Sequence, residues 1–254
     1  MKIRILGCGT STGVPKIGND WGQCDPAEPR NYRLRTSILV ESGGERILVD
    51  CGPDLRQQLL AAQVNRLNLV IVTHAHGDHC HGIDELRPVS QAIDRPLPLY
   101  ARSGVLSELE ERFGYAFARS EFYRPIVEAR ELGEELSFGH ARARFVDQPH
   151  GGPTSLGIRF DEGSHSAAYA IDFSDLTDEM AALYESSDVW IADCLTRRPH
   201  PTHAHLDGVL GWARELRVGQ LYLVHMGNGL DYRTLVAELP DWAAPAYDGL
   251  EIAL

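Results

Sequence analysis

Short apolar runs separated by polar turns recur along the whole chain, and their spacing predicts both strands and helices. Runs of about four to eight residues rich in Val, Ile and Leu are typical of β-strands, whereas apolar positions recurring every three to four residues are typical of helices. The predicted strands are Lys2–Leu6, Ser37–Glu41, Arg46–Asp50, Leu69–Thr73, Pro98–Ala101, Arg142–Asp147, Leu156–Phe160, Ala167–Ile171, Val189–Ala192 and Gln220–Val224. The predicted helices are Asp54–Val64, Asp84–Ala92, Ser103–Phe113, Thr177–Glu185, Leu206–Leu216 and Tyr232–Leu239.

The order of these elements indicates the fold class. Helices alternate with strands in the second half of the chain, whereas strands follow one another in the first half. This order favours an α/β (α+β) protein with mixed sheets covered by helices over a purely parallel barrel. Gly43 and Gly44 predict a hairpin turn, and the polar segment Gly18–Arg35 predicts a surface loop. Because no linker or low-complexity tract interrupts the pattern, we predict one domain spanning residues 1–254.

The amino-acid composition and the net charge narrow the classes of protein to which the chain could belong. The 254 residues are 43% hydrophobic and 24% charged, as in soluble globular proteins. No segment approaches the roughly 18 consecutive apolar residues of a membrane span, and the first ten residues do not resemble a secretory signal, so we predict a cytoplasmic protein without membrane contact. The net charge of −12 makes nucleic-acid binding unfavourable, although bound cations would let one cleft accept small anions. Scattered cysteines without a C-x2-C pair argue against a disulfide scaffold or a four-thiolate zinc finger.

The stretch THAHGDHCHG, residues 73 to 82, contains four of the eleven histidines and directly follows the apolar segment LVIVT. On an irregular loop at a strand end, His74 and His76 can converge on one cation while Asp78 and His79 turn towards a second. Imidazole with carboxylate suits zinc, manganese or iron, and the absence of thiolates argues against a purely structural zinc. A solvated histidine-rich loop is the alternative, but so many titratable groups at one strand end favour a metal site.

HAHGDH resembles the signature of the metallo-β-lactamase fold superfamily, and ILVDCG, DQPHGG, YAIDFS and YLVHMG follow in the expected order. The resemblance implies a four-layer αββα sandwich with two divalent cations, Zn2+ or Mn2+, at the rim between the sheets. It implies that His74, His76 and His150 hold one metal, that Asp78, His79 and His225 hold the other, and that Asp172 bridges them. Asp175 competes with Asp172 for the bridging role, and Asp50 orients the histidine loop from behind.

The stretch GCGTSTGVP, residues 7 to 15, is a glycine-rich loop whose role has to be distinguished from nucleotide binding. Its spacing is G-x-G-x3-G, no helical pattern follows and Pro15 interrupts, which excludes a dinucleotide-binding turn. It resembles the glycine-rich first loop of the phosphodiesterase-like members of the superfamily, including the tRNase Z and PhnP branches. Backbone amides of this loop would then line the cleft beside the metals; a tight structural turn is the alternative.

The segment from Asp193 to Trp212, DCLTRRPHPTHAHLDGVLGW, resembles the PhnP branch, phosphodiesterases that open a ribose cyclic phosphate. In that branch a histidine before a helix reaches into the metal site; by position it is His203, with His205 opening the helix beside it. Both histidines could instead only flank the helix. GIDELR also fits this branch, and Arg87 in it is either a contact to the substrate anion or part of a surface salt bridge.

One departure from the PhnP pattern concerns a small structural zinc site. Relatives often carry C-x-C-x2-C in the early loop and a histidine three residues past the last metal ligand. The corresponding positions here are Asn19, Trp21, Cys24 and Asn228, so three of the four ligands are missing. We therefore expect no structural zinc, and we expect Trp21 to fill its space by packing.

These features together predict a dinuclear metal-dependent hydrolase of a small cyclic or nucleotide-like phosphodiester. The two cations would share a hydroxide, held in part by Asp78, and His203 would protonate the leaving alkoxide or hold the phosphate. The predicted partner is a small anionic phosphodiester; a homodimer is possible, and an acidic chain without a long basic arm makes tRNA processing less favourable. Two alternatives stay open: hydrolysis of a carbon ester, lactone, thioester or β-lactam, and a metal-binding accessory protein of a cofactor pathway.

Overall fold

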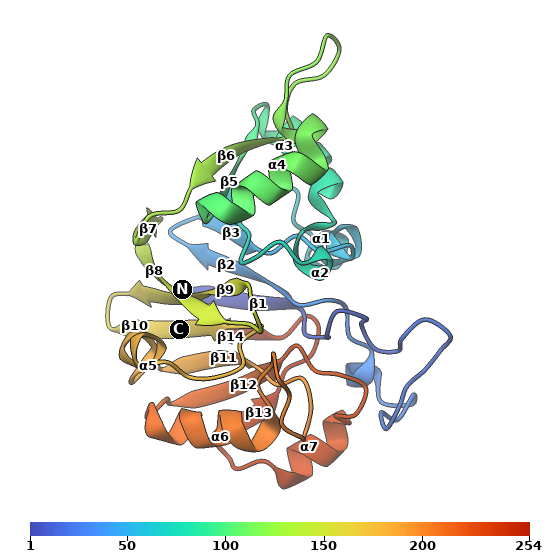
Figure 1. The fold of residues 1–254 in the computed structure, drawn as a ribbon, viewed down its shortest axis with the longest axis vertical. Helices are drawn as coiled ribbons and strands as arrows, with labels where there is room; N and C mark the ends of the chain where they lie inside the picture. The colour runs from blue at the N-terminus through green and yellow to red at the C-terminus, as the bar shows by residue number, and fades with distance from the viewer.

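Two seven-stranded β-sheets lie face to face in the computed structural model, which describes residues 1–254 (Figure 1). The first sheet has the order β14 (Glu251–Ala253), β1 (Lys2–Gly7), β2 (Ser37–Ser42), β3 (Glu45–Val49), β4 (Leu69–Ile71), β5 (Leu97–Ala101) and β6 (Val127–Glu131). The second sheet has the order β13 (Ala243–Pro245), β12 (Gln220–Val224), β11 (Val189–Asp193), β10 (His165–Ala170), β9 (Thr154–Glu162), β8 (Ala141–Pro149) and β7 (Glu135–Phe138).

Helices cover the outer face of each sheet. Those beside the first sheet are α1 (Leu55–Ala62), α2 (Gly77–Cys80), α3 (Arg87–Ile93) and α4 (Ser103–Phe117). Those beside the second sheet are α5 (Asp178–Tyr184), α6 (Leu206–Glu215) and α7 (Tyr232–Glu238) (Figure 1). Two 3-10 helices, η1 (Pro29–Asn31) and η2 (Ile83–Leu86), complete the list. The four-layer αββα arrangement predicted from the sequence is thus confirmed. None of the helices has the length and apolar composition that crossing a membrane requires.

The strands of the first sheet bury both faces, because neighbouring residues point to opposite sides. In β2, Ile38 and Val40 belong to a 43-residue core that lies between the two sheets and extends to the helices of the second sheet. Leu39 points the other way, into a separate 22-residue core against the helices. This two-sided burial explains why the strands appear in the sequence as nearly continuous apolar runs.

The direction of the strands places the chemistry at one edge. Strands β3, β4, β5 and β6 run parallel to one another, as do β10, β11, β12 and β13. The loops that leave the carboxyl ends of parallel neighbours emerge at the same edge of a sheet, where α/β proteins place their ligands. Residues that directly follow these strands are therefore brought close together although they are far apart in the sequence.

All ten predicted strands and six predicted helices are present with shifted ends, and four strands escaped prediction. Gly43 and Gly44 form the predicted hairpin turn, with positive φ at both residues. Strands β6 and β7 were missed because they lie at sheet edges and leave many side chains exposed, so no apolar run marks them. Strands β13 and β14 were missed because each is only three residues long.

Candidate metal centre

The predicted site residues meet at the edge where the parallel strands end. Asp50 follows β3, His74 and His76 lie in the loop after β4, His150 follows β8, Asp172 lies two residues after β10 and His225 follows β12. Asp78 and His79 lie in α2, which continues the loop after β4. The first sheet thus supplies one side of the cluster and the second sheet supplies the other.

Three of these residues adopt a left-handed backbone conformation that non-glycine residues rarely use. The φ angles are 65° for Asp50, 52° for Asp172 and 55° for His225. Such conformations cost on the order of 1–3 kcal/mol each and concentrate at functional sites. Each turns the chain sharply at its strand end, which is consistent with a backbone shaped for the cluster rather than for stability.

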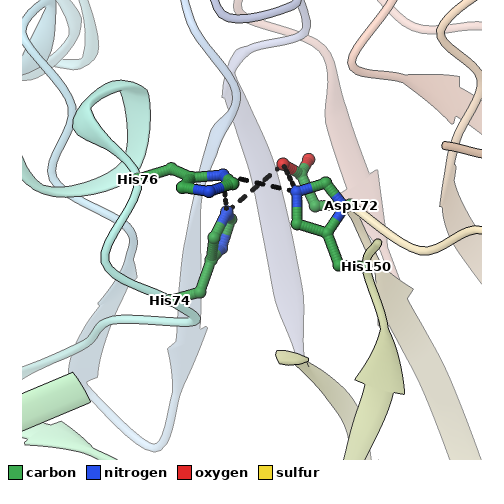
Figure 2. A group of neighbouring side chains, drawn as sticks. All are labelled: His74, His76, His150 and Asp172. Atoms are coloured by element: carbon green, nitrogen blue, oxygen red, sulfur yellow. Dashed lines mark hydrogen bonds and ion pairs between the residues drawn. The ribbon is translucent and has the colours of Figure 1, made fainter. Parts of the chain in front are cut away.

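The first group of ligand atoms comes from His74, His76, His150 and Asp172, which converge from the two sheets (Figure 2). His76 Nδ1 lies 3.0 Å from His74 Nε2 and 3.3 Å from His150 Nε2. Asp172 Oδ2 lies 3.3 Å from both His74 Nε2 and His150 Nε2. Tetrahedral zinc with Zn–N bonds of 2.0–2.1 Å would separate its ligands by about 3.3 Å. The group therefore fits a tetrahedral cation without rearrangement.

The second group consists of Asp78, His79, Asp172 and His225. His79 Nε2 lies 3.1 Å from Asp78 Oδ2, and His225 Nδ1 lies 3.2 Å from Asp172 Oδ1. One buried polar atom of each residue lacks a hydrogen-bond partner: Asp78 Oδ2, His79 Nε2, Asp172 Oδ1 and His225 Nδ1. Buried polar atoms are nearly always partnered, so four converging unpartnered atoms match the donor set of a second cation.

Asp172 belongs to both groups and presents one oxygen to each. Its Oδ2 faces His74 and His150, while its Oδ1 faces His225. Asp175, the alternative bridging residue, is exposed and its carboxylate only accepts a hydrogen bond from the amide of Leu176. The geometry therefore favours Asp172 as the bridge.

The electrostatics of the first ligand group favour binding of a cation. Burial lowers the pKa of His74 to about 4 and also lowers the pKa of His150, so both imidazoles are neutral and have a lone pair to donate at neutral pH. Burial alone would raise the pKa of Asp172, but the facing His225, His79 and His74 outweigh it and hold that pKa well below its usual value. The bridging carboxylate is therefore ionised.

Contacts behind the cluster fix how the imidazoles are oriented. Asp50 lies 2.8 Å from His79 Nδ1, and it also accepts hydrogen bonds from the amide and hydroxyl of Thr73. His150 Nδ1 lies 2.8 Å from the carbonyl oxygen of Thr202. With Nδ1 donating in each case, His79 and His150 direct Nε2 at the cluster, which is the usual way proteins orient metal-binding histidines. Asp50 therefore lies behind the histidine loop, in contact with both His79 and Thr73.

His203 stands beside the cluster and is held by a residue that sequence reasoning missed. Its Nδ1 lies 2.8 Å from Asp193 Oδ2, and its ring stacks on His225 with centroids 5.1 Å apart. Asp193 is fully buried. Burial lowers the pKa of His203, but the hydrogen bond and charge of Asp193 outweigh it, so the pKa is raised overall. Asp193 is the last residue of β11, and this position at a strand end is the sequence signal that could have drawn attention to it.

An open cavity of about 380 Å³ lies against both groups. Its walls include His76, Asp78, His150, Asp172 and His225, together with His203. Ser11 from the first loop and Thr202 add two hydroxyl groups. Pro153 is the only lining residue with a hydrocarbon side chain. A small, hydrophilic molecule fits such a wall.

Two predicted substrate-contact residues lie away from this cavity. Arg87 pairs with Asp84 at 3.5 Å and lies near the Tyr123 ring, which is the surface salt bridge that the sequence left open as the alternative. His205 caps α6 as expected, but its ring lies against Gly208 in the first helical turn. Of the two roles left open for Arg87, the structure shows the surface salt bridge, and His205 opens α6 beside His203 with its side chain held away from the cavity.

Some relatives hold a structural zinc in the early loop, and the residues that stand at those positions here are Asn19, Trp21, Cys24 and Asn228. Asn19 is exposed and accepts a hydrogen bond from the indole of Trp21, which is only partly buried. Cys24 is buried, as are the other four cysteines, and all five are unpaired. The indole N–H of Trp21 is thus directed to Asn19 at the surface of the loop.

Arg33 lies beside Cys24. Its guanidinium Nη1 lies 3.9 Å from Cys24 Sγ and donates to the carbonyl oxygen of Gly227, while Nη2 donates to that of Leu230 at 2.6 Å. Arg33 is 1% exposed. A fixed cation thus joins the early loop to the segment just after His225, so the predicted surface loop Gly18–Arg35 is firmly anchored at its end.

Removing bound metal should destabilise the protein, because ligands that bind only the folded state stabilise it. We expect EDTA to lower the midpoint of thermal unfolding by about 5–10 °C. This shift corresponds to a loss of about 2.7 kcal/mol in the free energy of unfolding, which is the stabilisation by a cation present at 100 times its dissociation constant. Zinc or manganese added in excess of EDTA should restore the midpoint. A His76→Ala, His150→Ala double variant should respond much less, and an unchanged midpoint in the wild type would contradict metal binding.

Comparison with known proteins gives matches over all or most of the chain. The profile of a β-lactamase superfamily domain matches residues 45–226. A crystal structure of a diphosphatase from the PhnP family superposes with a TM-score of 0.90 at 32% sequence identity, covering 99% of this chain and 97% of that one. Zinc-bound PqqB from Methylobacterium extorquens superposes with a TM-score of 0.81 at 20% identity, covering 100% of both chains. At 20% identity, the likeness to PqqB shows the fold alone.

An octanoyltransferase from Porphyromonas gingivalis is 31% identical over 259 residues. The alignment covers 99% of this chain and 51% of the relative, so the chain spans about half the length of that protein.

Proposed function

Because the chain belongs to the β-lactamase superfamily and carries the donor set of a metal-dependent hydrolase, we propose that it is a phosphodiesterase for a small cyclic or nucleotide-like phosphodiester. Its likeness to a PhnP-family diphosphatase over nearly the whole of both chains supports chemistry at phosphorus. The proposal includes two divalent cations, Zn2+ or Mn2+, one in each of the two ligand groups.

The observation that carries the proposal is the polar wall of the cavity. Pockets for small ligands are usually lined mostly by hydrophobic and aromatic side chains. Here the lining is imidazole, carboxylate and hydroxyl, with Pro153 as the one hydrocarbon side chain. An acyl chain or the ring system of a β-lactam would find no apolar surface beside the cluster, whereas a hydrated phosphate or sugar would be well accommodated.

In this proposal His74, His76 and His150 hold one cation and Asp78, His79 and His225 hold the other, with Asp172 shared. When bound, such cations lower the pKa of water and neutralise charge on phosphate oxygens. The chain's own residues then position the substrate. His203 faces the cavity beside the cluster, so it can donate a proton to the leaving alkoxide or hold a phosphate oxygen.

Asp193 is a positioning residue for His203 in this mechanism. Replacing Asp193 with Asn removes the charge that raises the pKa of His203. If the protonated imidazole is the active form, His203 then loses its proton at lower pH, and the alkaline limb of the kcat/KM profile should move to lower pH. We expect turnover to fall by about 10- to 100-fold at neutral pH. If the alkaline limb of the Asp193→Asn profile stayed at the wild-type pH, this would contradict the coupling between Asp193 and His203.

Hydrolysis at a carbonyl is the second candidate, because two cations serve a carbon ester or thioester as well as a phosphodiester. A metal-binding accessory role in a cofactor pathway is the third. The test is a substrate panel of bis-p-nitrophenyl phosphate, ribose cyclic phosphate, a thioester and nitrocefin, with zinc or manganese supplied. Turnover confined to the phosphorus substrates supports our proposal, turnover of a carbonyl substrate alone supports the second candidate, and no turnover supports the third.

A further inference from the structure

The turn Thr10–Gly13, which follows β1, forms one wall of the cavity through Ser11. Gly13 N donates to the carbonyl oxygen of Thr10 at 2.8 Å and closes the turn. Thr10 N donates to the carbonyl oxygen of Met226 at 3.3 Å, and Gly9 pairs with the same residue as an isolated bridge. Because Met226 directly follows His225, the turn is fixed beside the second ligand group.

The backbone under this turn permits only glycine at two positions. A Cβ at Gly7 would lie 2.1 Å from the carbonyl oxygen of Arg35, and one at Gly9 would lie 2.9 Å from that of Arg33. Gly13 has a φ of +65°, in the left-handed region that favours glycine. The loop therefore packs flat on neighbouring backbone and holds Ser11 in one place.

Ser11 offers donors that nothing in the chain uses. Its side chain is exposed to the cavity, and neither its hydroxyl nor its amide hydrogen-bonds to another residue. The rest of the wall is mainly imidazole and carboxylate, which are committed to the ligand groups in our proposal. Residues 7–16 contain no acidic side chain and include Lys16, although the chain as a whole carries a charge of −12. The turn thus offers an anion two free donors, and its own residues carry no carboxylate.

We propose that Ser11 binds a phosphate oxygen of the substrate through its hydroxyl and amide, opposite the metal ligands. This inference rests on the proposed function and makes Ser11 a residue that selects for phosphorus. A phosphodiester has two non-bridging oxygens that share its negative charge, so one can face the metal centre while the other accepts hydrogen bonds from Ser11. The oxyanion formed from a carbonyl has a single such oxygen and gains less from a second donor site.

Equilibrium binding of inorganic phosphate tests the inference without relying on turnover. Hydrogen bonds to charged groups contribute enough for a loss of about 10- to 100-fold in affinity when one is removed. We expect Ser11→Ala in the metal-loaded protein to weaken phosphate binding by that factor in isothermal titration calorimetry. Ser11→Thr keeps the hydroxyl and should retain most of the affinity. Ser137→Ala, the same change at an exposed serine of β7, should bind like the wild type.

The outcomes separate this inference from the proposed function. Because Ser11 makes no hydrogen bond within the chain, Ser11→Ala should unfold at the wild-type temperature, and its metal content should be unchanged. If Ser11→Ala binds phosphate as tightly as the wild type while the wild type hydrolyses phosphodiesters, the Ser11 assignment is wrong and the proposed function stands. A wild type that binds no phosphate overturns the assignment as well. In the remaining outcome, Ser11→Ala binds phosphate more weakly but the wild type cleaves only carbonyl substrates. The Ser11 site would then stand, and the proposed function would be refuted.

Discussion

Asp172→Asn is expected to lose at least about 10³-fold in kcat/KM on a phosphodiester and to retain substantially less metal than the wild type. Asp172 presents one oxygen to each ligand group, and a neutral amide cannot supply the charge that both groups share. Metal-ion catalysis contributes several kcal/mol to transition-state stabilisation, and about 4 kcal/mol corresponds to a factor of about 10³. Asparagine tolerates the positive φ of this position, so the variant should fold.

Elemental analysis of the purified variant, together with its rate on bis-p-nitrophenyl phosphate, measures both effects. Asp175→Asn is the matched control, because Asp175 is exposed and stands only three residues further along. It should keep wild-type metal content and rate. If Asp172→Asn keeps two metals and full activity while Asp175→Asn loses them, the assignment of the bridge is wrong and Asp175 takes its place.

His203→Ala is expected to cut turnover by about 10²- to 10⁴-fold, the range typical of a lost general acid or base. The metal content should not change, because His203 belongs to neither of the two groups that converge on Asp172 from both sheets. His200→Ala is the matched control: His200 is exposed, and its ring centroid lies 5.3 Å from that of His203. Loss of metal in His203→Ala would instead make His203 a ligand, which its position near Asp172 and Asp193 also permits.

The leaving group distinguishes the two roles proposed for His203. p-Nitrophenolate departs without a proton, whereas an alkoxide needs one. A general acid therefore predicts a much larger loss for His203→Ala on a ribose cyclic phosphate than on bis-p-nitrophenyl phosphate. A residue that only holds the phosphate predicts the same loss on both substrates. Equal and negligible losses on both would remove His203 from the mechanism.

The positions of the cluster residues were predictable because each one is tied to a strand end. An apolar run followed at once by a polar side chain marks both the strand and the edge at which it stops, as in LYLV before His225. The resemblance to the superfamily then indicated which strand ends meet. Asp193 shows the same pattern after VWIA, which marks it as a strand-end residue, but its pairing with His203 becomes apparent only in the folded chain.

Side chains outside the strand ends were harder to predict. Arg87 and His205 have side chains suited to binding an anion, but whether such a side chain points at a cavity depends on the rotation of its helix, which local sequence does not determine. Arg33 was missed for a different reason. Charged residues are rarely fully buried, and its guanidinium donates to carbonyl oxygens about 200 residues away in the sequence. Only the folded arrangement reveals such partners.

Pairing between β1 and β14 has a consequence for how the protein is made. Lys2 pairs with Ala253 and Arg4 with Glu251, so β1 can pair with β14 only after the whole segment between them has been synthesised. Contacts of such long sequence separation slow folding, because the chain must lose its freedom before it gains the contact. The turn that carries Ser11 also hydrogen-bonds to Met226, so this wall of the cavity can form only after residue 226 has been synthesised. A nascent chain that stops short of residue 226 would display the histidine loop without the partners that complete it.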